Sequence, residues 1–279
     1  MRTFIVFAGP NGSGKSSVRD SIANPVEVII DPDRVAREIN PGDPRSVDAL
    51  AGRAAVSLFE KSVDQGKSIS METTLTGHSA VMRMQRAKDA GYEVSLIYVA
   101  LRLPEMNVRR VAARVRQGGH AIDPDIVRKR VGTSLANLPR ALSIADQAIV
   151  LDNSGPTHRR VLETAAGRVT YLADELPGWL TQQMPTILAA IKDGAGATTE
   201  NPSAPAGARP SLISTVFKAL RRPESEAAAP WTTPPIAMAE RLAAFVRAAA
   251  ETAQRQKTGA AEPEMDANKP PRPSKGPRP

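Results

Sequence analysis

Eight residues near the start of the chain carry its clearest chemical pattern. Residues 9–16 read Gly-Pro-Asn-Gly-Ser-Gly-Lys-Ser and match the Walker A pattern, G-x-x-x-x-G-K-[S/T], at every fixed position. They follow an apolar run at 3–8 and precede a helical pattern, which is the context that a phosphate-binding loop requires. Backbone N–H groups and the positive end of the following helix surround phosphate oxygens in such a loop. The pattern therefore predicts a nucleoside triphosphate site.

The side chains of this loop have separate expected roles. Lys15 is expected to neutralise the β- and γ-phosphates and the Ser16 hydroxyl to ligate Mg²⁺, so ATP and Mg²⁺ are the predicted cofactors. A glycine-rich turn that binds nothing is the alternative, and the complete match in context argues against it. The loop residues predicted to bind ATP are Gly9, Pro10, Asn11, Gly12, Ser13, Gly14, Lys15, Ser16 and Ser17.

The loop alone does not say what becomes of the γ-phosphate. GTPases, motor ATPases and small-molecule kinases share it, but the chain has no guanine-reading Asn-Lys-x-Asp sequence and is too short for a helicase. Asp33 follows the predicted strand at 26–30, at the sheet edge where ligands bind in open α/β folds. It could accept a proton from a hydroxyl or hold Mg²⁺ through water, or it could cap the helix expected at 34–39. The local pattern leaves these readings open.

Two further segments supply polar groups to the same edge. Glu72 and the following threonines end the predicted strand at 68–71, where they favour substrate contact over a capped loop leading into the next helix. Arg110 and Arg114 lie four residues apart on one predicted helical face, and Gly118-Gly119 could form a hinge after them. A mobile lid with arginines over the transferring phosphates is a recurrent feature of kinases, whereas a solvated basic face is the alternative.

Composition limits the other classes of function. The 279 residues include no cysteine, which excludes disulfides and thiolate chemistry. Net charge is +8, but residues 1–195 and 196–279 each carry an excess of only four basic groups, and the basic run at 102–130 has no aromatic residue on which a base could stack. Nucleic acid is therefore not the expected partner. Without a signal peptide or a membrane-length apolar run, we expect a soluble cytoplasmic protein with no membrane contact.

Alternating strand and helix patterns predict a parallel α/β sheet covered on both faces. We expect strands at 3–8, 26–30, 68–71, 94–101, 147–151 and, more weakly, 168–172. The helical patterns lie at 15–23, 34–39, 46–65, 79–90, 105–117, 124–144, 157–166 and 180–191. The expected fold is thus a three-layer P-loop kinase fold with a mainly parallel sheet of five to six strands.

Composition changes near residue 195, because 13 of the 24 prolines fall in the last 84 residues. Such a segment buries too little apolar surface to offset the entropy of ordering it. We therefore expect a kinase domain at 1–192 and a largely disordered, Pro/Ala-rich extension at 193–279. Short helices are expected within it at 211–222 and 236–256.

Taken together, these segments resemble the zeta toxin family of P-loop kinases. The resemblance covers about residues 1–180 and rests on the following residues: Gly-Pro-Asn-Gly-Ser-Gly-Lys-Ser at 9–16, Ile-Asp-Pro-Asp at 30–33 with Ala36, Glu-Thr-Thr-Leu-Thr-Gly at 72–77, the arginine lid with Gly118-Gly119-His120, Ser-Leu-Ala-Asn-Leu at 134–138 and Leu-Asp-Asn-Ser at 151–154. The Gly-Gly-His lid is similar to one branch of the family.

This resemblance implies a kinase that phosphorylates a sugar hydroxyl of a UDP-amino sugar such as UDP-N-acetylglucosamine, and it raises an antitoxin protein as a further partner. It implies that Asp33 is the general base and that Lys15, Arg110 and Arg114 stabilise the moving phosphoryl group. By the same resemblance, the remaining site residues are Asn153 for ATP and Glu72, Thr74 and His120 for the substrate. A kinase for another small molecule or a polynucleotide end, and an ATP-dependent binding module without catalysis, are the alternatives.

Overall fold

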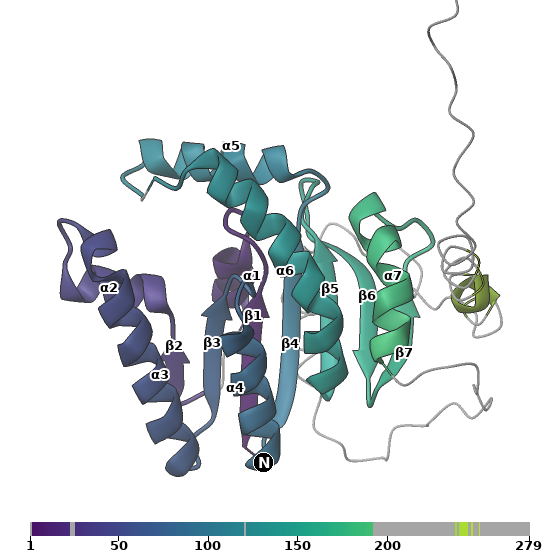
Figure 1. The fold of residues 1–279 in the computed structure, drawn as a ribbon, viewed down its shortest axis with the longest axis horizontal. Helices are drawn as coiled ribbons and strands as arrows, with labels where there is room; N and C mark the ends of the chain where they lie inside the picture. Colours follow the sequence, from purple (N-terminus) through teal and green to yellow (C-terminus); the bar gives the residue numbers. More distant parts are fainter. Residues whose placement is uncertain are drawn as a thin grey trace, which may run out of the picture.

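The computed structural model describes residues 2–22, 26–119 and 121–191, together with positions 238, 240–244, 247 and 251. A seven-stranded sheet lies at its centre in the order β2-β3-β1-β4-β5-β6-β7, with helices on both faces (Figure 1). The strands are β1 (Thr3–Ala8), β2 (Val28–Ile30), β3 (Ile69–Thr73), β4 (Glu93–Ala100), β5 (Gln147–Asp152), β6 (Arg159–Ala165) and β7 (Arg168–Leu172). This arrangement confirms the predicted α/β fold class.

The helices alternate with the strands along the chain. They are α1 (Lys15–Ser21), α2 (Pro32–Ile39), α3 (Asp48–Asp64), α4 (His78–Asp89), α5 (Pro104–Arg116), α6 (Pro124–Ile144) and α7 (Gly178–Ala190), with a 3₁₀ turn at Pro44–Val47. In Figure 1, α3, α4, α6 and α7 cover one face of the sheet, α1 lies behind it, and α5 crosses the edge above β1 and β4. No helix in the described part of the chain is long and apolar enough to cross a membrane.

Strand direction decides where the site can form. The five strands from β2 to β5 run parallel, so their carboxyl ends meet at one edge of the sheet. The register pairs Ile30 with Met71 and Phe7 with Glu72. The segments that follow β2, β3 and β1 therefore leave the sheet next to one another, at the edge where open α/β folds bind ligands.

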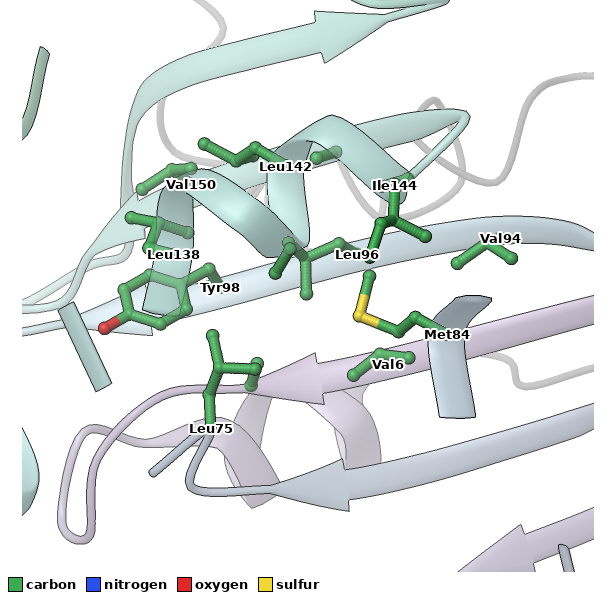
Figure 2. Packing of buried hydrophobic residues seen from close by; sticks show 14 of the residues in the cluster. Val6, Leu75, Met84, Val94, Leu96, Tyr98, Leu138, Leu142, Ile144 and Val150 are labelled. Carbon is green, nitrogen blue, oxygen red and sulfur yellow. The ribbon is translucent and has the colours of Figure 1, made fainter. Parts of the chain in front are cut away.

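Alternate residues of the central strands enter two separate apolar cores. Ile5 and Phe7 of β1 pack on the α1 side with Val18. Phe4 faces the other layer and meets Phe59 of α3 with ring centroids 5.3 Å apart. Figure 2 shows this second core, in which side chains from β4, α4 and α6 interdigitate. Because both faces are buried, the strands read as nearly continuous apolar runs.

The expected helix at 157–166 is wrong, because these residues contain β6. β6 pairs antiparallel with β5 and with β7, so the sheet has seven strands instead of five to six. The run Val161–Thr164 is buried without a break, and periodicity cannot distinguish such a short run from a buried helix. The missed signal is the following Ala166-Gly167, whose φ values of 51° and 73° suit a two-residue hairpin loop.

Part of the expected helix at 236–256 is described and contacts the sheet. Positions 238, 240–244, 247 and 251 are helical, and Met238 and Leu242 pack against the larger core. Arg241 donates hydrogen bonds to the carbonyl oxygens of Leu172, Ala173 and Asp174, at the end of β7 and directly after it. The expected helix at 211–222 lies outside the described residues, and the division at 192 stays a prediction.

We predict that Arg241→Ala lowers the free energy of unfolding by about 1–3 kcal/mol, because backbone carbonyls lose a charged donor. Urea unfolding of the full chain measures this change. Arg247→Ala is the matched control, since Arg247 belongs to the same helical segment but is exposed. Equal unfolding midpoints for the two variants would contradict the docking of this helix on β7.

Candidate active site

The loop between β1 and α1 adopts a conformation that needs glycine. Gly9 and Gly14 have φ values of 136° and 100°, which side chains rarely tolerate. A Cβ atom on Gly9 would lie 2.1 Å from the carbonyl oxygen of Val99, and one on Gly14 would lie 2.3 Å from Nδ2 of Asn153. The loop is therefore wedged between the end of β4 and the segment after β5.

Three side chains from distant parts of the chain hold this loop in place. Asn107 Nδ2 of α5 donates to the carbonyl oxygen of Asn11 at 2.7 Å, and Asn153 Nδ2 donates to that of Ser13 at 2.8 Å. Arg130 of α6 donates from Nη1 to Asn11 Oδ1 at 3.0 Å. Sequence reasoning named Asn153 but missed Asn107 and Arg130. The lid helices thus contact the phosphate-binding loop directly.

Lys15 lies across the mouth of the loop and is only 7% exposed. Its Nζ donates to the carbonyl oxygen of Pro10 at 3.1 Å and lies 4.0 Å from Oε1 of Glu72. Burial lowers the pKa of Lys15, while the nearby Glu72 carboxylate acts in the opposite direction. A buried ammonium group with one carbonyl and one distant carboxylate as its partners among the described residues is well suited to meet an added anion.

Asp31 and Glu72, here called the acidic pair, lie at the ends of the neighbouring strands β2 and β3. The Ser16 hydroxyl donates to the Glu72 carboxylate, with both oxygens at 3.1 Å. Arg19 Nη1 donates to Asp31 Oδ2 and to Glu72 Oε2, each at 2.8 Å. Burial raises the pKa of Glu72, and the Lys15 charge opposes that shift. Arg19 thus joins the two carboxylates of the acidic pair, and Glu72 connects them directly to the Walker A serine.

The structure separates the two aspartates after β2. Asp31 is the N-cap of α2 and accepts a hydrogen bond from the backbone N–H of Arg34 at 3.2 Å. The alternative that Asp33 caps this helix is therefore wrong. Asp33 lies in the first turn with an exposed side chain, close enough for its charge to act on Lys15. Its carboxylate is available to a molecule at the mouth of the site.

The loop after β3 is anchored by a buried residue in an unusual backbone conformation. Leu75 has a φ of 57°, and its side chain is fully buried, directed toward Tyr98 (Figure 2). Asn137 Nδ2 of α6 donates to the carbonyl oxygen of Leu75 at 2.9 Å. The hydroxyls of Thr74 and Thr76 lie 2.8 Å apart. Thr74 is thereby held between β3 and the anchored Leu75, with its hydroxyl bonded to that of Thr76.

The lid arginines differ in their surroundings. Arg110 is half-buried and donates from Nη2 to the carbonyl oxygen of Asn153 at 2.7 Å. Arg114 is exposed, and its charge contributes to lowering the pKa of Lys15, after burial itself. The structure therefore brings both predicted arginines to the loop, but only Arg110 is bonded to the segment after β5.

The two glycines expected as a hinge end α5 in a defined way. Gly119 N–H donates to the carbonyl of Arg114 at 2.9 Å and Gly118 N–H to that of Val115 at 3.0 Å. With Gly118 at a φ of 86°, this is a Schellman motif. His120, which was expected to bind substrate, lies outside the described residues.

His158 was not predicted as a site residue, and it lies beside the phosphate-binding loop. Its Nε2 is buried and has no hydrogen-bond partner among the described residues, and it lies 3.7 Å from the Cβ position of Gly14. Burial lowers the pKa of His158, and the Arg110 charge adds to this effect. The imidazole is therefore neutral at neutral pH. The sequence offered one signal for this residue: a histidine five residues after Asn153, at the end of the loop that joins β5 to β6.

The donor set fits a Mg²⁺ ion that arrives with phosphates. Mg²⁺ in phosphate-handling proteins uses one or two carboxylates, with phosphate oxygens and water completing its octahedron. The Ser16 hydroxyl and the acidic pair form such a set. Within the described ranges, no group of three or more histidine and acidic residues could hold a metal by itself. Phosphate oxygens would therefore be needed to complete the coordination.

A Walker A loop between the first strand and helix of a mostly parallel α/β sheet defines the P-loop class of proteins. Within this class, the family model described as Zeta toxin matches residues 2–158, which is more than half of the chain. The chain therefore belongs to the zeta toxin family, as its sequence resemblance indicated. Family membership supports an ATP-dependent phosphotransferase.

Individual relatives are less informative about activity. An uncharacterised protein of Haemophilus influenzae is 44% identical over 126 residues, which are 45% of this chain and 90% of that protein. The AvrRxo1-ORF1:-ORF2 structure with ATP has a TM-score of 0.49 at 14% identity and covers 88% of this chain and 80% of that one. The PezAT toxin–antitoxin system of Streptococcus pneumoniae has a TM-score of 0.46 at 18% identity, with coverages of 79% and 86%. These two likenesses are too distant to assign a substrate.

We predict that His158→Gln loses less stability than the wild type as the pH falls below about 6.5. The pKa of His158 is lower in the folded than in the unfolded chain, so its contribution to stability is present above the unfolded value and lost on acidification. Urea unfolding across this pH range measures the difference. His78→Gln, on the exposed start of α4, is the control, and a His158→Gln curve parallel to the wild type would contradict the prediction.

Proposed function

We propose that this protein transfers the γ-phosphoryl group of ATP to a sugar hydroxyl of a UDP-amino sugar similar to UDP-N-acetylglucosamine. The observation that carries the proposal is the meeting of Lys15, Ser16, Glu72 and Asp33 at one sheet edge. A phosphate cradle alone would suit any nucleotide-binding protein. An exposed carboxylate beside the cradle favours transfer to an acceptor hydroxyl, and membership of the zeta toxin family supports the sugar as acceptor.

In this proposal the phosphate-binding loop and Lys15 bind the triphosphate, and Asn153 shapes the loop from behind. Ser16 and the acidic pair would hold Mg²⁺. When bound, Mg²⁺ neutralises charge on the β- and γ-phosphates. The contacts of Glu72 with Ser16 and Arg19 favour this metal role over direct contact with the sugar. Thr74 and His120 remain our candidates for substrate binding.

Asp33 is proposed as the general base. Its carboxylate accepts the proton of the sugar hydroxyl, and the oxygen attacks the γ-phosphorus. The bond between the γ-phosphorus and the β–γ bridging oxygen breaks, which leaves ADP and a phosphorylated sugar. Lys15 stabilises the charge that develops on the leaving oxygens.

The arginines are assigned by their contacts. Arg114 is unrestrained enough to reach the transferring group from the lid, and Arg130 already lies at the loop through Asn11. Arg110 instead orients the Asn153 segment through its carbonyl oxygen. We therefore propose Arg114 and Arg130 as the groups that stabilise the phosphoryl oxygens. An antitoxin as partner is proposed from family membership alone.

The proposal predicts phosphorylation of a UDP-amino sugar when the purified full chain is incubated with ATP and Mg²⁺. A panel of UDP-N-acetylglucosamine, UDP-N-acetylgalactosamine, UDP-glucose and a 5′-hydroxyl oligonucleotide, followed by mass spectrometry, measures which acceptor gains one phosphate. Transfer to UDP-glucose alone, or to the oligonucleotide alone, would refute the UDP-amino sugar and identify that molecule as the acceptor. If no acceptor gains phosphate while ATP still binds, the proposed acceptor is refuted and nucleotide binding is retained.

The base assignment predicts that Asp33→Ala lowers kcat about 10²- to 10⁴-fold and leaves the dissociation constant for ATP nearly unchanged. The reason is that Asp33 is exposed and contacts no part of the phosphate cradle other than through its charge. Glu38→Ala on the same helix is the control, because the contact of Glu38 within the described residues is an exposed pair with Arg34. Comparable kcat values for the two variants would refute the role of Asp33.

A further inference from the structure

Arg19 of α1 makes contacts that neither nucleotide binding nor phosphoryl transfer explains. Its side chain is only 17% exposed, and its single nitrogen Nη1 lies 2.8 Å from one oxygen of Asp31 and 2.8 Å from one of Glu72. Nε is bonded to Asp20 at 3.0 Å. One positively charged group thus joins two carboxylates from different strands, at the position where the donor set for Mg²⁺ is found.

We propose that Arg19 is a built-in cation that neutralises the acidic pair while no nucleotide is bound, and that it keeps this site from taking up free divalent ions. The inference rests on the proposed metal role of the acidic pair. In its terms, a divalent ion enters this site together with the nucleotide and not before it.

The balance of charge explains why. In the free protein, Lys15 and Arg19 offset the charges of Asp31 and Glu72, which lie within 4.0 Å of one or both cations. The third carboxylate on Arg19, that of Asp20, is 66% exposed, so water and salt screen its charge. A divalent ion at the acidic pair would approach Arg19 at close range and would lose hydration without gaining net negative charge. A triphosphate adds several negative charges at Lys15 and Ser16. The attraction of the divalent ion to the phosphates and carboxylates then exceeds its repulsion by Arg19.

The geometry also shows what Arg19 does when the metal is absent. Two carboxylates that share one partner only 2.8 Å away would repel each other without it. Arg19 therefore keeps the acidic pair in place for the incoming ion. It is a positioning residue, since it acts on the metal through the two carboxylates.

Mn²⁺ binding to the nucleotide-free full chain, followed by electron paramagnetic resonance, tests this inference. We expect wild-type affinity to be weak, with a dissociation constant of about 10⁻³ M or more. Arg19→Gln should bind one Mn²⁺ at least about tenfold more tightly, because the like charge is gone and the polar contacts are partly kept. Arg19→Lys, which keeps the charge, should stay near the wild type.

Arg86→Gln is a matched control, because Arg86 also lies between two carboxylates, those of Glu60 and Asp64, each at 3.5 Å on the exposed helix surface. It should leave Mn²⁺ affinity unchanged. The double variant Arg19→Gln with Glu72→Gln should lose the gained affinity, which would place the ion at the acidic pair. Unchanged or weaker Mn²⁺ binding by folded Arg19→Gln would overturn the proposal.

A wild-type measurement decides the matter even if Arg19→Gln does not fold. Micromolar Mn²⁺ binding by the nucleotide-free wild type would overturn the proposal. Weak binding that tightens at least about tenfold with a non-hydrolysable ATP analogue, after subtraction of the Mn²⁺ that the analogue binds without protein, would support it. None of these measurements requires an acceptor or a phosphoryl transfer. Failure of the proposed kinase reaction and failure of the Arg19 proposal are therefore distinguishable.

Discussion

The site depends on the contacts of the Glu72 carboxylate, whose side chain is 14% exposed. It accepts hydrogen bonds from Ser16 and Arg19 and lies 4.0 Å from Lys15. A charge that is largely removed from water is strongly unfavourable without such partners. Loss of Ser16, Arg19 or Lys15 would therefore raise the free energy of the ionised Glu72 carboxylate. The contacts tie α1 and its phosphate-binding loop to β3, and through Arg19 to Asp31 after β2. The charged contacts and the register of the sheet thus favour the same placement of α1 beside the ends of β2 and β3.

Local pattern was sufficient to predict the phosphate-binding loop. Its glycines are required by the backbone conformation, and the whole motif lies within eight consecutive residues. The parallel strands were predictable for a similar reason, since buried strands between helices read as short apolar runs. β6 was mistaken for a helix because a run such as Val161–Thr164, buried on both faces, has no period of two. The hairpin glycine after it was the better guide.

Arg19, Asn107 and Arg130 could not be found from local pattern. Each reaches partners far away in the sequence: Arg130 contacts Asn11 across 119 residues and Asn107 contacts it across 96. Nothing in a basic or amide side chain on a helix reveals such a partner until the sheet order is known. Asp31 and Asp33 show a different limit: two aspartates lie two positions apart in the sequence, and only the capping hydrogen bond of Asp31 distinguishes their roles.

Leu75 links the stability of the core to the shape of the loop after β3, which borders the site. Its left-handed backbone costs roughly 1–2 kcal/mol, and full burial of a leucine side chain contributes about 1.5–3 kcal/mol. The conformation persists because burial outweighs strain by a narrow margin. Warming that loosens the packing around Tyr98 would release this loop before the sheet melts. If Thr74 binds the acceptor as proposed, acceptor binding would then be lost at a lower temperature than the fold.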